Sequence, residues 1–295
     1  MHDHDHYKEA KKSILYGIVL NSIFTVIELV GGILSNSLAL LSDTIHDFSD
    51  SVALGISYYA NQKAQSSPTK TMTFGYRRTT ILAAFINSTI LMALTFFLFY
   101  RAYLRILNPE PVNGKMVFVI AIFGIITNGI IAFKMLRGKD KDLNIKSVFW
   151  HITEDFLGWV GVLIAGAIIY FTGAYIIDPI ISILIGLIVI YSAWGIVKES
   201  ANIILEGVPE GLNVQEIGTE IKNIQNVNDA HDIHVWSLGT DYNALSAHVV
   251  ISNMTVDQSH EVLNKINTML KEKFSIEHTT IEFECSHCDS DRVCY

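Results

Sequence analysis

Charged residues are scarce in this chain. They make up 17% of its 295 residues, whereas hydrophobic residues make up 50% and the mean hydropathy is +0.35. This scarcity excludes an ordinary soluble domain of the same length and favours a chain embedded in a membrane. Cysteine is scarcer still, with three residues that all lie within the last eleven. An odd number leaves one cysteine unpaired in any intramolecular disulfide scheme and favours metal ligands or reduced thiols.

The few charges are unevenly distributed along the chain. Residues 1–205 contain 16 Lys and Arg against 14 Asp and Glu, whereas residues 206–295 contain 5 against 15. An apolar, nearly neutral body is therefore followed by an acidic tail. Such a tail repels nucleic acid and anionic lipid, but it suits metal cations as partners.

Six apolar runs each supply the roughly 20 residues that cross about 30 Å of hydrocarbon. We expect them at 13–34, 37–59, 79–104, 115–136, 148–171 and 177–197. The first run lacks a small-residue cleavage site, so we expect no removable signal peptide. Lys and Arg gather in the amino tail and in the second and fourth connections, with Arg105 and Lys115 as exceptions. This pattern predicts that both termini lie in the cytoplasm. We expect a multi-pass protein of the cell (plasma or inner) membrane.

The tail has the pattern of a small folded domain. Beyond the segment GVPEGLN, amphipathic periodicity predicts helices at 214–224 and 256–274, and alternation predicts strands at 230–237, 243–251 and 279–284. The order αββαβ favours an α+β ferredoxin-like domain with its helices on one face of the sheet. We therefore expect a His-rich cytoplasmic tail (1–12), a six-helix transmembrane domain (13–204) and a cytoplasmic domain (205–295).

Ionisable residues interrupt two of the apolar runs. His46 and Asp50 lie four residues apart and share a helix face, and so do His151 and Asp155. Asp43 lies one turn before His46, where we expect it to support the ligands or to line a pathway. Ionisable side chains are costly in a membrane and normally face the bundle interior in pairs. Two facing pairs would offer two nitrogens and two oxygens, which suits tetrahedral Zn²⁺.

Each of these features also has a structural interpretation. A His–Asp pair can be an internal hydrogen bond that only joins helices, although the same spacing on two helices favours a metal site. Glu28 shares a face of the first run with Asn21 and Thr25, where it either lines a hydrated pathway or serves helix packing. Asp47 points about a quarter-turn away from His46 and faces either solvent or a cytosolic mouth.

Five motifs together carry a resemblance to a known family. The segments SLALLSDTIHDFSD, TFGYRR, HITED, IDPIIS and AHDIHVW, in this order on six spans and an αββαβ tail, resemble the cation diffusion facilitators, the proton-coupled zinc transporters. The resemblance covers essentially the whole chain. It implies a homodimer that the tail domain helps to assemble. It also implies a transport site at His46, Asp50, His151 and Asp155, in which His at the first position is associated with zinc preference.

The resemblance further implies regulatory metal sites in the tail domain. The matching ligands are His231, His248 and Glu284, with Cys285 and Cys288 similar to the terminal cysteine pair of some members. The CxxC spacing supplies half of a zinc site, which His287, Cys294 or the amino-terminal HDHDH could complete. We expect HDHDH to be a solvated metal collector. Three further histidines are expected to be ordinary surface or packed imidazoles: His234, His260 and His278.

The connection between the second and third runs departs from the family pattern. Some relatives carry a further metal site there, but AQSSPTKTMTFGYRR contains neither Asp nor His, so we expect no metal in it. In those relatives, a basic residue after FG pairs with an acidic residue below the sixth span. This chain has Arg78 and Glu206 at the matching positions. The pair is a candidate charge hinge, unless Arg78 is an interfacial anchor.

Charge balance suggests how such a site would work. With neutral imidazoles and ionised carboxylates, Zn²⁺ neutralises the four-residue site, and two protons do the same once the metal has left. Alternating access would then couple inward proton movement to outward zinc movement. A membrane zinc enzyme is an alternative hypothesis. Two observations weaken it: catalytic zinc normally has three protein ligands whereas this site would have four, and the sequence contains no HExxH motif. A metal sensor is the third hypothesis, and the sequence contains no recognisable output domain.

Overall fold

The computed structural model describes residues 22–64, 68–136, 143–239 and 242–285. The chain divides into two compact units: Met1–Ile56 with Ile86–Gly195, and Ser57–Phe85 with Ile196–Tyr295. The amino-terminal HDHDH and the carboxyl-terminal residues His287, Cys288 and Cys294 lie outside the described residues.

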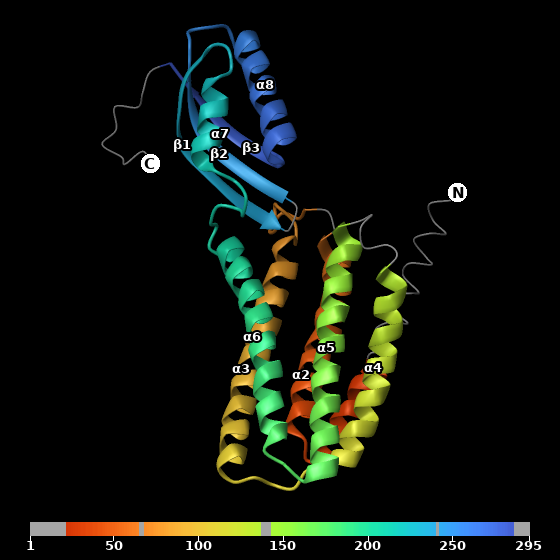
Figure 1. Cartoon of the computed structure of the whole chain (residues 1–295). Helices are drawn as coiled ribbons and strands as arrows, with labels where there is room; N and C mark the ends of the chain where they lie inside the picture. The colour runs from red at the N-terminus through yellow and green to blue at the C-terminus, as the bar shows by residue number, and fades with distance from the viewer. Residues whose placement is uncertain (1–21, 65–67, 137–142, 240–241, 286–295) are drawn as a thin grey trace. The chain divides into compact units, whose positions relative to one another are not determined.

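Long helices lie side by side in the first unit (Figure 1). A first helix at Ser22–Ser35 is followed by α2 (Leu38–Ala64), α3 (Arg78–Leu107), α4 (Gly114–Leu136), α5 (Leu143–Thr172) and α6 (Ile177–Ile204). The predicted run 37–59 begins one residue before α2, and the four later runs lie inside α3 to α6. The apolar runs therefore predicted these helices well.

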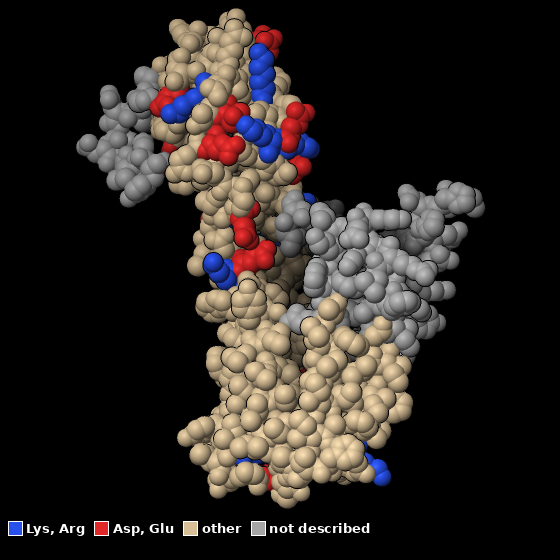
Figure 2. All heavy atoms as spheres, in the orientation of Figure 1, with Lys and Arg blue, Asp and Glu red and all other residues tan. Residues whose placement is uncertain are grey.

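Three helices of the described chain are long and apolar enough to cross a membrane: Arg78–Leu107, Asp155–Thr172 and Ile177–Ile204. Two shorter apolar helices, Ser22–Ser35 and Gly114–Thr127, accompany them. Asp43, Asp47 and Asp50 interrupt the apolar sequence of α2, which is not among the three. On the face that Figure 2 shows, a broad area of helix surface carries no Lys, Arg, Asp or Glu. The predicted number of six spans stays a prediction.

Glycine allows α4 and α5 to approach each other closely. Trp159 of α5 is fully buried against Gly124 of α4, where a Cβ atom would collide with the indole ring. Gly166 of α5 lies in the same way against the backbone of Phe118. Small residues at helix contacts are typical of membrane bundles, since lipid supplies no hydrophobic force between helices.

Asp178, in the first turn of α6, caps a different helix. Its carboxylate is fully buried and accepts hydrogen bonds from Ser37 Oγ at 2.5 Å, from Leu38 N at 2.6 Å and from Ala39 N at 3.3 Å. These groups form the amino end of α2, whose first amides have no partner within the helix. The negative charge also suits the positive end of the helix dipole. Asp178 therefore fixes where α2 begins against α6.

Arg105 provides the counter-charge for this end of the bundle. It is only 5% exposed and lies with Nη1 3.5 Å from Asp178 Oδ2. It donates to the backbone oxygen of Asn36 at 2.5 Å and to Glu110 Oε2 at 2.9 Å. Hydrogen bonding from Asn36 and the charge of Arg105 hold the pKa of the exposed Glu110 carboxyl below its ordinary value. Arg105, an exception in the Lys and Arg pattern, is thus a buried structural ion.

The αββαβ order of the tail is found in the second unit. Its elements are α7 (Val214–Lys222), β1 (Val227–Gly239), β2 (Tyr242–Ile251), α8 (Val256–Phe274) and β3 (Ile276–Glu284). The strands lie in the order β1-β2-β3, with β1 antiparallel and β3 parallel to β2. The strands β1 and β3 begin three residues earlier than predicted, and α7 ends two residues earlier. Asn213 caps α7, and a capping box of Thr255 and Gln258 begins α8.

The two faces of the sheet have different roles. Leu245 and Val249 of β2 pack with Ile221 of α7 and Ile266 of α8 in one buried core. Because successive side chains of a strand alternate, His248 lies on the opposite face. Both helices therefore cover one face of the sheet, as predicted, and the other face is left for polar side chains.

The network around Arg105 yields a stability prediction. Arg105→Ala leaves the buried carboxylate of Asp178 without its counter-charge, and breaking a buried pair costs about 3–5 kcal/mol. We expect the thermal midpoint of the detergent-solubilised protein to fall by at least about 5 °C. The matched control is Arg101→Ala, because Arg101 is exposed on the same helix. Equal midpoints for the two variants would contradict the structural role of Arg105.

Candidate metal centres

The helices α2 and α5 bring three of the four predicted transport-site residues together. Nε2 of His46 lies 3.8 Å from Asp50 Oδ2 on the same helix and 3.5 Å from Asp155 Oδ1 on α5. One ligand atom from each residue lies within 4.8 Å of the others. The three side chains are mostly buried, with exposed fractions of 13%, 29% and 15%. The arrangement offers one nitrogen and two carboxylates to a cation.

His151 lies in α5, one helical turn before Asp155. Its side chain is outside those that the structure describes. The four-residue spacing puts His151 and Asp155 on the same helix face. The fourth predicted ligand therefore stays a prediction from spacing.

A second acidic cluster lies in the same unit. Glu28 of the first helix and Asp43 and Asp47 of α2 are 0%, 3% and 8% exposed, and one oxygen of each lies within 4.8 Å of the others. Glu28 and Asp43 were expected to support the ligands or line a pathway. Asp47 was expected to face solvent or a cytosolic mouth, and the structure instead buries it. Asp43 groups with Asp47 and Glu28, and it also lines a narrow cavity with His46 and Asp155.

One sequence pattern could have identified this cluster. Asp43 and Asp47 are four residues apart, which is the spacing that singled out His46 and Asp50. Applied to every pair of ionisable residues, that criterion finds both clusters on α2. The contribution of Glu28, from another helix, needed the structure.

The open face of the tail sheet joins three more predicted ligands. His231 of β1 and His248 of β2 face each other in the antiparallel ladder. Glu284, the last residue of β3, lies with Oε1 2.7 Å from His248 Nδ1 and with Oε2 3.5 Å from His231 Nε2. One ligand atom of each residue lies within 4.8 Å of the others. Two imidazoles and a carboxylate are a donor set that suits zinc.

Other residues near this face differ in what they contribute. Asp232 has a left-handed backbone (φ 50°) where the ladder is irregular, and its Oδ2 lies 3.8 Å from His248 Nε2. Cys285 directly follows Glu284 and is exposed, and its CxxC partner Cys288 lies outside the described residues. His234 and His260 are exposed, and His278 packs edge-on against Phe74.

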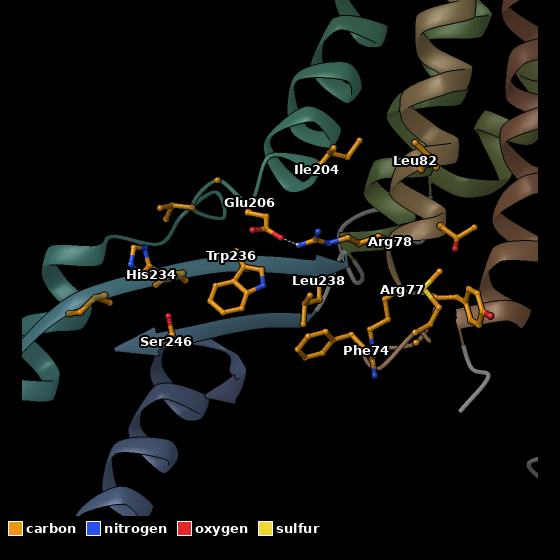
Figure 3. A pocket seen from close by; sticks show the side chains of 18 residues that line it. Phe74, Arg77, Arg78, Leu82, Ile204, Glu206, His234, Trp236, Leu238 and Ser246 are labelled. Atoms are coloured by element: carbon orange, nitrogen blue, oxygen red, sulfur yellow. Dashed lines mark hydrogen bonds and ion pairs between the residues drawn. The ribbon is translucent and has the colours of Figure 1, made fainter. Parts of the chain in front are cut away.

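The candidate charge hinge forms an ion pair in the second unit. Nη2 of Arg78 lies 3.1 Å from Oε1 of Glu206 and also donates to the backbone oxygen of Ser237 at 3.3 Å. The pair lines a cavity of about 920 Å³ whose other walls include Phe74 and Trp236 (Figure 3). Because the two side chains are 36% and 62% exposed, the pair adds little to stability. The pair joins the first residue of α3 to the segment that follows α6.

Comparison with known proteins identifies two family models along the chain. The model described as "Cation efflux transmembrane domain" matches residues 14–205, and the one described as "Cation efflux protein, cytoplasmic domain" matches residues 209–285. A solved structure titled as the metal-bound C-terminal domain of the CzcD transporter from Cupriavidus metallidurans is 36% identical. It covers 25% of this chain and 99% of that domain, with a TM-score of 0.23.

Three curated relatives match along nearly the whole chain. The "Cation efflux system protein CzcD" of Alcaligenes sp. is 38% identical over 98% of this chain and 91% of its own. The "Cadmium, cobalt and zinc/H(+)-K(+) antiporter" of Bacillus subtilis is 36% identical over 98% and 94%. The "Zinc transporter ZitB" of Pectobacterium atrosepticum is 36% identical over 100% and 92%. The chain therefore belongs to the cation efflux family, the cation diffusion facilitators, and is a membrane transporter of metal cations rather than an enzyme.

Proposed function

We propose that this transporter exports zinc from the cytoplasm in exchange for protons. The observation that carries the proposal is the spacing of donor atoms around His46, whose Nε2 lies 3.5 Å from Asp155 and 3.8 Å from Asp50. In a tetrahedral zinc site with bonds of about 2.0–2.1 Å, ligand atoms lie about 3.4 Å apart. His151 is the proposed fourth ligand. Little movement of these side chains would be needed to bind the ion.

Charge balance in the apolar interior supports an exchange mechanism. Zn²⁺ bound by two neutral imidazoles and two carboxylates leaves no net charge, and two protons on the imidazoles compensate the carboxylates when zinc has left. Metal and protons therefore compete for His46 and His151. Two conformations, open to opposite sides of the membrane, would convert inward proton movement into outward zinc movement.

The names of the relatives support the same substrates. The Bacillus subtilis relative is named for cadmium, cobalt, zinc, protons and potassium, and the Pectobacterium relative is named for zinc. Both are similar to this chain over almost its full length. An imidazole-containing site suits borderline Zn²⁺ better than a site made of carboxylates alone.

We propose the same overall organisation for this chain that the sequence predicts. Six spans occupy a transmembrane domain at 13–204, after a cytoplasmic His-rich tail at 1–12 and before a cytoplasmic domain at 205–295 that joins two chains in a homodimer. The boundary lies close to the ends of the two family models, at residues 205 and 209. The Lys and Arg pattern supports cytoplasmic termini, and the proposed location is the plasma or inner membrane.

The open face of the tail sheet is proposed as a regulatory metal site. His231, His248 and Glu284 would hold the ion, with Cys285 and Cys288 as further ligands. A bound cation would neutralise part of the acidic charge of this domain and so favour pairing of two copies. The three described side chains come from three different strands, so metal binding would also stabilise the sheet.

Zinc flux in proteoliposomes with an imposed pH gradient tests the proposed function. We expect zinc and protons to cross the membrane in opposite directions. A zinc gradient alone should therefore alkalinise the lumen when zinc enters it and acidify the lumen when zinc leaves it. Proton movement is measured with an entrapped pH dye. Zinc flux without any proton movement would reject the antiport mechanism and leave a uniporter.

The proposed ligands yield a direct prediction. Asp50→Ala or Asp155→Ala removes an anionic ligand, and zinc flux should fall to that of protein-free liposomes while the protein still inserts. The matched control is Glu199→Ala, because Glu199 is an exposed carboxylate at the far end of α6. Near-normal flux in either aspartate variant would reject the site.

The choice of metal is predicted to depend on His46. His46→Asp leaves one nitrogen and three carboxylates, a set that tolerates harder or larger ions and depends less on tetrahedral geometry. We expect transport to persist and the ratio of cadmium or manganese flux to zinc flux to rise several-fold. Competitive uptake into everted vesicles at equal expression measures this ratio. An unchanged ratio with transport intact would place selectivity elsewhere.

The proposed charge hinge can be distinguished from an interfacial anchor. If Arg78 and Glu206 act as a pair, Arg78→Gln and Glu206→Gln should slow zinc flux equally, and the double variant should be no slower than either. Each should change the free energy of unfolding by less than about 1 kcal/mol, because the pair is exposed. An anchor would predict that only Arg78→Gln has an effect.

A further inference from the structure

Three buried carboxylates lie together outside the four proposed transport ligands. Glu28 comes from the first helix, whereas Asp43 and Asp47 lie one turn apart on α2. Glu28 is fully buried, Asp43 is 3% and Asp47 8% exposed, and one oxygen from each lies within 4.8 Å of the others. We call this set the carboxylate triad. Its donor atoms are all oxygens.

No described Lys or Arg compensates the carboxylate triad, and the nearest group that can carry a positive charge is the His46 imidazole of the proposed transport site. No Lys or Arg forms an ion pair with any of its members among the described residues. Both oxygens of Glu28 and Oδ2 of Asp43 are buried without a hydrogen-bond donor there, and the polar group that Glu28 faces is another carboxyl, that of Asp47. A single buried ion without a partner costs several kcal/mol. Three ionised carboxylates in one place therefore require compensation, either by a bound cation or by protons.

Glu28 is the independent evidence for a ligand site. Two aspartates one turn apart on α2 could serve that helix alone, but Glu28 extends into the same space from a different helix and is fully buried there. Helix packing alone would be satisfied by an apolar side chain at this position, without the cost of removing a carboxylate from water. The convergence of two helices on one space is typical of a binding site.

The carboxylate triad adjoins the proposed transport site. Asp43 lines a narrow cavity together with His46, Asp155 and Gly158. The carboxyl of Asp43 lies against Gly158, where an added Cβ would be 3.4 Å from Oδ1. The two ligand sets are therefore neighbours with different chemistry, because one contains imidazole and the other contains oxygen alone.

We propose that Glu28, Asp43 and Asp47 form a second cation site, which takes a hard divalent cation of the Ca²⁺ or Mn²⁺ class. Hard cations select carboxylate oxygens, whereas the transport site offers the nitrogen that zinc favours. With Ca²⁺–oxygen bonds of about 2.3–2.6 Å, two oxygens bound to one Ca²⁺ can lie up to about 5 Å apart, which accommodates the observed spacing. A divalent ion also compensates two of the three charges. The proposal does not depend on which metal the transport site carries.

Equilibrium dialysis of the purified full-length protein tests the second site. The protein in detergent is held at a limiting, buffered Zn²⁺ concentration, titrated with excess Mn²⁺, and analysed for both metals. We expect the wild type to bind one more Mn²⁺ per chain than Glu28→Gln, with the same amount of Zn²⁺ bound by both. Asp43→Asn is a second variant with the same expected loss. Glu199→Gln, which changes an exposed carboxylate on α6, should bind as the wild type does.

Each other outcome overturns the proposal. Equal Mn²⁺ binding by the wild type, Glu28→Gln and Asp43→Asn would show that the triad holds protons instead of a metal. Parallel loss of Zn²⁺ and Mn²⁺ in both variants, in protein that remains monodisperse by size-exclusion chromatography, would show that the carboxylates belong to the transport site. Since zinc and manganese are counted separately, failure of the second site leaves the zinc proposal intact.

Discussion

A charge inside an apolar helical bundle is costly unless another charge or a set of hydrogen bonds compensates it. At the amino end of α2 this compensation is complete. Asp178 accepts three hydrogen bonds and lies beside Arg105, which in turn bonds to Asn36 and Glu110. About two turns further along the same helix, one imidazole, that of His46, lies between two carboxylates, and three more carboxylates cluster nearby. The network around Asp178 is therefore compensated by the protein's own groups. The carboxylates around His46 are compensated only when protons or metal cations bind there.

The sequence predicted that His46 and Asp50 lie together but not how the acidic residues divide between clusters. The four-residue spacing is sufficient to put His46 with Asp50 on one face. Spacing alone does not assign Asp43 to a cluster, because on a helix this residue lies about 60° from His46 and about 40° from Asp47. Which neighbour it joins depends on Glu28, which belongs to another helix. Arg105 is similar, since its partner Asp178 lies 73 residues away and no local pattern connects them.

The tail domain shows the same limit in a different form. Alternation of apolar residues predicted its strands and therefore which face of β2 carries His248. Strand pairing then fixed the register that places His231 opposite His248. The register shift after His231, where Asp232 adopts a positive φ, could not be predicted. Alternation indicates which face of a strand each side chain occupies, but not where the pairing of two strands becomes irregular. The extra residues of β1 and β3 have the same cause, since pairing extends strands beyond their apolar segments.

The hydrogen bonds between α2 and α6 also determine which helices can move relative to each other. Ser37 and Asp178 join the two helices at one level, and the hydroxyls of Ser42 and Ser182, 2.6 Å apart, join them about one turn further along. Sliding α2 along α6 would break both contacts in an interior that offers no water to replace them. These two contacts therefore hold the amino-terminal turns of α2 and α6 together. A change in the separation of His46 and Asp155 is accordingly cheaper when α5 moves and this pair stays fixed.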